Sequence, residues 1–99
     1  MSIKNAKEIA LFQAYPNPFK DEVHFLYNFA QDCEINLSIY SLSGKLIKVL
    51  SSGRKSQGTE EKIVWNGKNA EEEQMPNGFY LAVLTAGRDK QMKKIILLR

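Results

Sequence analysis

The chain has 99 residues, of which 43% are hydrophobic and 25% charged, and this is the composition of one ordinary globular domain. A net charge of +3 is too small to indicate a nucleic-acid partner by itself, and a single cysteine excludes an internal disulfide. No apolar run approaches the roughly 20 residues that a membrane helix needs, so no transmembrane segment is expected.

Residues 1–8 are predicted to be a linker or an artificial extension ahead of the domain, with a frayed strand and a short helix as alternatives. These residues lack the apolar stretch of a secretory signal peptide. If the domain is exported, we expect the signal peptide to lie upstream in a longer parent protein. The predicted domain spans residues 9–99.

Alternation of apolar and polar residues recurs along the domain, with turn residues between the runs. The first expected strand covers residues 9–14. The residues expected to face inward on the next two strands are Val23, Phe25, Tyr27 and Phe29, and then Cys33, Ile35, Leu37 and Ile39. Ser43-Gly44 predicts a tight hairpin turn, after which the chain returns as a strand over residues 45–50.

The polar stretch 51–60 indicates a loop or a crossing between sheets, and Ile63 and Trp65 are expected to point into the core beyond it. The turn dipeptides Asn66-Gly67 and Asn77-Gly78 then bracket a polar loop.

The strand over residues 79–84 is apolar at every position, which is typical of a central strand covered on both faces. Ala86-Gly87 turns the chain into a last strand over residues 91–99. About seven short strands without intervening helices predict an all-β fold, an immunoglobulin-like sandwich of antiparallel strands.

No set of residues for catalysis is found. His24 is the single histidine, it lies on an expected strand without a nucleophile motif, and we interpret it as a surface residue. Cys33 lies in an apolar alternation and is expected to be an inert core thiol. The acidic residues match no calcium loop. We therefore expect no enzyme activity, no metal and no cofactor.

Several aromatic residues raise the alternative of a sugar-binding platform. They are Tyr15, Tyr40, Trp65 and Tyr80. At alternating strand positions such residues are more often packing residues of the core or sheet surface. An accessory module of a secreted hydrolase, either carbohydrate-binding or a spacer, remains the alternative function.

A group of motifs gives a more specific indication. In Tyr15-Pro16-Asn17-Pro18-Phe19, two prolines fix φ and remove two hydrogen-bond donors, so this segment makes a stiff, non-pairing approach to the sheet. The motifs that follow it in order are Leu37-Ser38-Ile39-Tyr40, Ser43-Gly44-Lys45, Trp65-Asn66-Gly67-Lys68-Asn69 and Asn77-Gly78-Phe79-Tyr80.

Together these motifs resemble, over residues 15–99, the C-terminal sorting domain of the type IX secretion system, a relative of the immunoglobulin-like domain of the flagellar hook-capping protein. The ending Lys93-Lys94-Ile95-Ile96-Leu97-Leu98-Arg99 resembles the basic-then-aliphatic last strand of sorting domains and separates the two relatives.

The resemblance implies a non-catalytic module that directs a larger cargo protein through the outer membrane. Its implied partners are the outer-membrane secretion translocon and a sortase-like protease that removes the domain and transfers the cargo to a surface lipopolysaccharide. The implied location is the periplasm in transit, and then the medium or the cell surface. We expect a monomer or weak self-association.

The candidate sorting residues are carried over motif by motif. They are Pro16, Asn17 and Pro18 of the first motif, Gly44 and Lys45 of the second, and Lys93, Lys94, Ile95, Ile96, Leu97, Leu98 and Arg99 of the terminal motif. For the first two motifs a purely structural role stays open, because turn prolines and a hairpin glycine are common in any sandwich. In the terminal motif we expect the four aliphatic residues to anchor the strand and the basic residues to present the signal.

Overall fold

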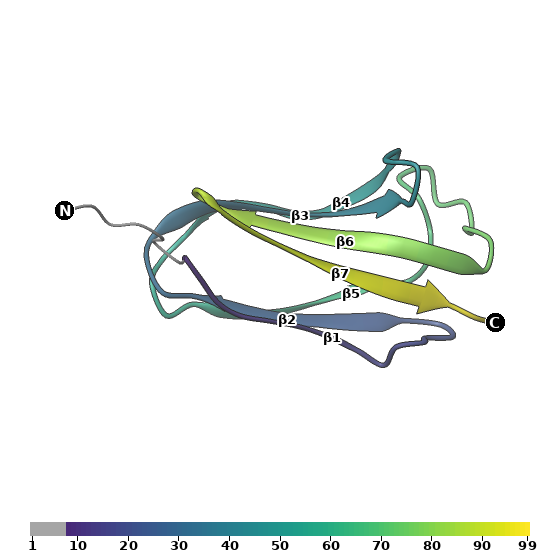
Figure 1. Ribbon diagram of the computed structural model, residues 1–99, viewed down its shortest axis with the longest axis horizontal. Helices are drawn as coiled ribbons and strands as arrows, with labels where there is room; N and C mark the ends of the chain where they lie inside the picture. Colours follow the sequence, from purple (N-terminus) through teal and green to yellow (C-terminus); the bar gives the residue numbers. More distant parts are fainter. Residues whose placement is uncertain (1–7) are drawn as a thin grey trace.

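The computed structural model describes residues 8–99, which form seven strands arranged in two layers (Figure 1). The strands are β1 (Ile9–Tyr15), β2 (Val23–Phe29), β3 (Cys33–Ser41), β4 (Leu46–Lys55), β5 (Glu60–Trp65), β6 (Gly78–Ala86) and β7 (Asp89–Leu97). One sheet has the order β1-β2-β5 and the other the order β4-β3-β6-β7, with every pair antiparallel. The predicted immunoglobulin-like sandwich is confirmed. The prediction for residues 1–8 falls almost wholly outside the described residues and stays a prediction.

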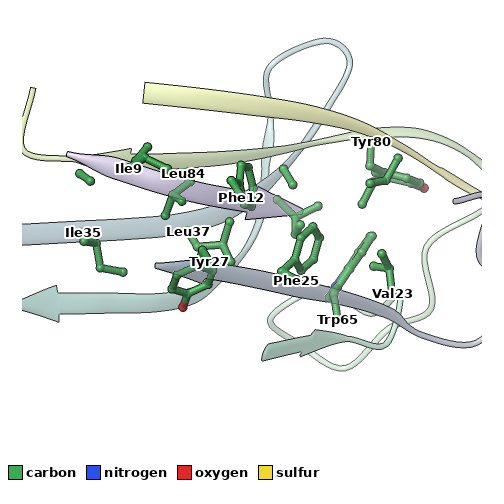
Figure 2. Packing of buried hydrophobic residues seen from close by; sticks show 14 of the residues in the cluster. Ile9, Phe12, Val23, Phe25, Tyr27, Ile35, Leu37, Trp65, Tyr80 and Leu84 are labelled. Carbon is green, nitrogen blue, oxygen red and sulfur yellow. The ribbon is translucent and has the colours of Figure 1, made fainter. Parts of the chain in front are cut away.

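The core lies between the two sheets and follows the period of two that strands impose on their side chains. On β2 the inward residues predicted from the sequence are all buried, and so are those on β3. Figure 2 shows side chains from both layers interdigitating in this space. The cluster contains aromatic residues from four strands as well as aliphatic ones, and together they fill the space between the sheets.

The prediction of a loop over residues 51–60 is wrong for its first half. β4 continues to Lys55, and Ser51, Ser52 and Arg54 pair with β3. These polar residues are compatible with a strand because β4 is the edge of its sheet, where side chains reach solvent. Only residues 56–59 turn the chain into β5.

β6 is a central strand as predicted, but only one of its faces is covered. Tyr80, Ala82 and Leu84 point into the core, whereas Phe79 on the other face is 48% exposed. The four-stranded sheet therefore carries apolar side chains on its outer face, and this face rather than a second layer explains the unbroken apolar run over residues 79–84.

Candidate functional site

The proline segment and the loop after β5 meet at one corner of the core. Phe19 is 1% exposed and packs against Trp65 with ring centroids 5.7 Å apart, and Trp65 meets Tyr80 edge-on at 5.4 Å. Figure 2 shows Trp65 and Tyr80 pointing toward one another from the two layers. The Trp65 indole donates a hydrogen bond to the Lys68 carbonyl at 2.8 Å. Trp65 is thus a core anchor, as the sequence predicted.

The first and the terminal motif are in direct contact. Asn17 donates from its side-chain amide to the Lys94 carbonyl at 2.9 Å, and its amide oxygen accepts from the Ile96 N–H at 2.9 Å. The Phe19 backbone adds two bonds, from its N–H to the Ile96 carbonyl at 2.8 Å and from the Leu98 N–H to its carbonyl at 2.9 Å. The segment 17–19 therefore lies along the edge of β7 that β6 does not cover.

The four aliphatic residues of the terminal motif do not all anchor the strand. Ile95 and Leu97 are fully buried, whereas Ile96 is half-buried and Leu98 is 58% exposed. The expectation of four anchors is wrong because adjacent residues of a strand point to opposite faces. The terminal motif has two buried and two outward-facing aliphatic residues.

The two terminal lysines are also separated by this alternation. The Lys93 ammonium lies 5.9 Å from the ring centroid of Phe12, at the side facing β1, and the Lys94 ammonium lies 5.2 Å from that of Phe79, on the outer face. A single flat partner surface cannot contact both lysines while β7 is in place. The prediction that the basic residues present a signal therefore stays a prediction, with Lys93 and Lys94 on opposite faces of β7.

Arg99 lies just beyond β7 and binds to the loop between β5 and β6. Its guanidinium donates to the Met75 carbonyl at 2.8 Å and covers Gly67, where an added Cβ would come within 2.8 Å of Nη2. Its backbone N–H donates to the Asn77 side-chain oxygen at 3.0 Å. Arg99 is solvent-exposed but is held in place by these contacts.

The second motif forms the turn between β3 and β4. Gly44 has φ +94°, a conformation that glycine adopts without penalty, and its N–H donates to the Ser41 carbonyl at 3.0 Å. Gly44 and Lys45 are exposed. In Figure 1 this turn lies at the same end of the sandwich as the C-terminus, and its glycine is hydrogen-bonded within the turn, to Ser41.

The residues considered for catalysis or metal binding do not form a common site. His24 is half-buried on β2, stacks on Tyr15 at 5.8 Å, and lies 3.7 Å from Glu22. Cys33 is buried, and burial raises the pKa of its thiol. Within residues 8–99 no three metal-ligating side chains form a cluster, and no helix there is long and apolar enough to cross a membrane.

One polar cluster lies between β4 and β5, which are edge strands of the two different sheets. Lys55 donates to Glu61 at 2.6 Å, and the Tyr27 hydroxyl donates to the same carboxylate at 2.8 Å. Burial is the main cause that raises the pKa of Tyr27 to about 12. Burial also acts to raise the pKa of Glu61, but the hydrogen bonds from Lys55 and Tyr27 outweigh it and lower that pKa.

The possible aromatic platform does not exist as a surface. Trp65 is 0% and Tyr80 6% exposed, and both belong to the core. Tyr15 lies on the three-stranded sheet and Tyr40 on the four-stranded sheet. The four side chains share no face that could receive a sugar.

These features define a small all-β domain whose first and terminal motifs meet at the edge of β7. Residues 13–98 match the family model described as secretion system C-terminal sorting domain. The chain belongs to this family, the C-terminal sorting domains of type IX secretion, which are generally non-catalytic.

A solved structure supports the fold. The crystal structure of dimeric latent PorU from Porphyromonas gingivalis contains a similar sandwich, with a TM-score of 0.66 and 21% sequence identity over 88% of this chain. The chain spans 9% of the length of that protein. A comparison with curated proteins found no match.

The sequence does not predict several contacts that hold the proline segment and the terminal motif in place. Asn77 and Gly67 are predicted from the sequence only as turn residues, but the structure shows that both also contact Arg99. Phe19 was quoted in the first motif but was not predicted to pack against Trp65. Its place directly after Pro18, in a segment that cannot pair regularly, is the available signal, because a large aromatic residue there is favoured to be buried.

Proposed function

We propose that the chain is the sorting module at the C-terminal end of a larger cargo protein and directs this cargo through the outer membrane. Its proposed partners are the secretion translocon and a sortase-like protease that removes it. The cargo passes through the periplasm and is then secreted or attached to the cell surface. The observation that carries this proposal is the match to the sorting-domain family over residues 13–98.

Position in the parent protein separates this function from that of a sugar-binding or spacer module. The test is a reporter fused to the chain in a host with type IX secretion, with the chain placed last in one fusion and first in the other. Secretion is expected only when the chain is last. Retention of both fusions in the cell, or equal secretion of both, would refute the proposal.

Within the terminal motif we assign recognition to the outward-facing side. Lys94, Ile96 and Leu98 point away from the core on one face, next to the exposed ring of Phe79. Ile95 and Leu97 supply the buried anchor. An exposed lysine on an edge strand contributes little to stability, so it is free to be read by a partner or to deter unwanted pairing.

Single variants separate recognition from protection of the edge. Lys94→Ala is expected to reduce reporter secretion while the free energy of unfolding stays within about 1 kcal/mol. Lys90→Ala is the matched control, because Lys90 is also exposed and lies on the same face of β7. Lys93→Ala tests the opposite face, and the double variant Lys93→Ala with Lys94→Ala tests both. Normal secretion by the double variant would show that the lysines only protect the edge.

A further inference from the structure

The free edge of β7 is occupied along its C-terminal half. In an edge strand, every second residue turns its N–H and C=O away from the sheet. On β7 four successive groups of this kind are bonded: the Lys94 carbonyl, the Ile96 N–H and carbonyl, and the Leu98 N–H. The segment 17–19 thus takes the place of a neighbouring strand.

A side chain supplies half of these bonds, and the sequence explains why. Pro16 and Pro18 have no N–H, so the segment cannot pair through a regular backbone ladder. The Asn17 carboxamide has a donor and an acceptor in one plane, as a peptide group has, and it bonds one group on each side of Ile95. Aspartate would keep the acceptor and lose the donor.

The anchor of β7 does not depend on this contact. Ile95 and Leu97 are buried, and β7 pairs with β6 along its whole length. Asn17 itself is exposed. Its two hydrogen bonds therefore affect the position and opening of the terminal segment more than the existence of the fold.

We propose that Asn17 is a positioning residue that holds the edge of β7 so that residues 94–98 are presented in one fixed conformation to the secretion machinery. This inference rests on the proposed sorting function and assigns to the first motif the role of holding the terminal one. Asn17 acts through β7 and is not itself the group that the machinery reads.

The test combines amide hydrogen exchange, resolved by residue, with reporter secretion by the same variants of the whole chain. Asn17→Ala is expected to raise the exchange rate of the Ile96 amide about tenfold and to leave that of Leu84, in the centre of the sheet, unchanged. Reporter secretion is expected to fall. Asn17→Asp keeps the bond from the Ile96 N–H, so both effects should be intermediate.

Asp32→Ala is the matched control. Asp32 is also exposed and also accepts a bond from a distant backbone N–H, that of Gln57 at 2.7 Å, but in the turn between β4 and β5, which adjoins neither β6 nor β7. This variant is expected to leave Ile96 exchange and secretion unchanged.

Two results would overturn the inference while the proposed function stands. Reduced secretion by Asn17→Ala with unchanged Ile96 exchange would mean that Asn17 is read directly. Faster exchange with normal secretion would mean that the fixed position of β7 is not required. Failure of the unmodified domain to export the reporter would instead refute the proposed function, and this inference with it.

Discussion

At the scale of single residues, Trp65 joins the proline segment, the opposite sheet and the loop after β5. It packs against Phe19 from the proline segment and Tyr80 from the opposite sheet, and it donates to the Lys68 carbonyl. A large side chain at 0% exposure with an internal partner for its N–H is a structural residue.

Trp65→Ala is expected to lower the free energy of unfolding by about 3 to 5 kcal/mol, because it leaves a large cavity between the two sheets. Domains of this size have a total stability of about 5 to 15 kcal/mol, so little reserve would remain. Urea denaturation followed by circular dichroism measures the change. Val64→Ala, at a neighbouring residue that is 38% exposed, is the control. A loss below about 1 kcal/mol for Trp65→Ala would contradict the assigned role.

The burial of Trp65 and Cys33 was predictable from alternation within one strand. The contacts of Asn17 were not, because its partners lie 77 and 79 residues away along the chain. They depend on which strand forms the edge of the other sheet, and local patterns carry no information about the order of strands in a sheet. The recognised motifs therefore did not reveal that two of them are hydrogen-bonded to one another.

At the scale of elements, β7 divides its residues between two faces. Ile95 is fully buried in the core, whereas Ile96 beside it is only half-buried on the outer face, across from Phe79. Ile95 and Ile96 are thus adjacent and chemically identical but have different surroundings, so the effects of the same substitution at the two positions can be compared directly.

Ile95→Ala is expected to cost about 2 to 5 kcal/mol of stability because it empties a buried site. Ile96→Ala should cost clearly less, about 1 kcal/mol, and should affect secretion more than stability if the outward face is read. Thermal denaturation and the reporter assay together give the comparison. Equal losses of stability for the two variants would contradict the observed alternation.

The extent of β4 shows the limit of pattern reading for an element. Its second half is polar on both faces, so composition favoured a loop. The strand persists because its backbone pairs with β3 and because its side chains meet solvent or the Tyr27 cluster rather than the apolar core. Edge strands need little apolar character, and sequence periodicity detects them poorly.

At the scale of the whole molecule, the cluster of Lys55, Glu61 and Tyr27 joins the two sheets on the side away from β7. Its ion pair and hydrogen bonds connect the two sheets, as the apolar contacts do inside the sandwich. Because the pKa of Glu61 is lowered in the folded state, the cluster makes stability depend on pH.

The stabilisation from Glu61 is fully present above the unfolded-state pKa of about 4.5 and is lost as the pH falls through the lower folded-state pKa. Conversely, the raised pKa of Tyr27 predicts a loss of stability as the pH rises from about 10 through about 12. Denaturation curves measured across this pH range test both directions. Glu61→Gln should flatten the acid side, whereas the control Glu60→Gln, at an exposed neighbour, should not. An unchanged acid profile for Glu61→Gln would exclude the cluster as its cause.

The contact between the proline segment and β7 has a consequence for synthesis. Residues 17–19 are made early and residues 94–98 late, yet each group needs the other to complete the edge of the sheet. The corner around Phe19 and the buried sites of Ile95 and Leu97 stay unfilled until the last strand has left the ribosome. A copy truncated within these residues therefore lacks a complete core. Completion of the core therefore has to wait until β7 has been synthesised, although most of the core residues precede β7 in the chain.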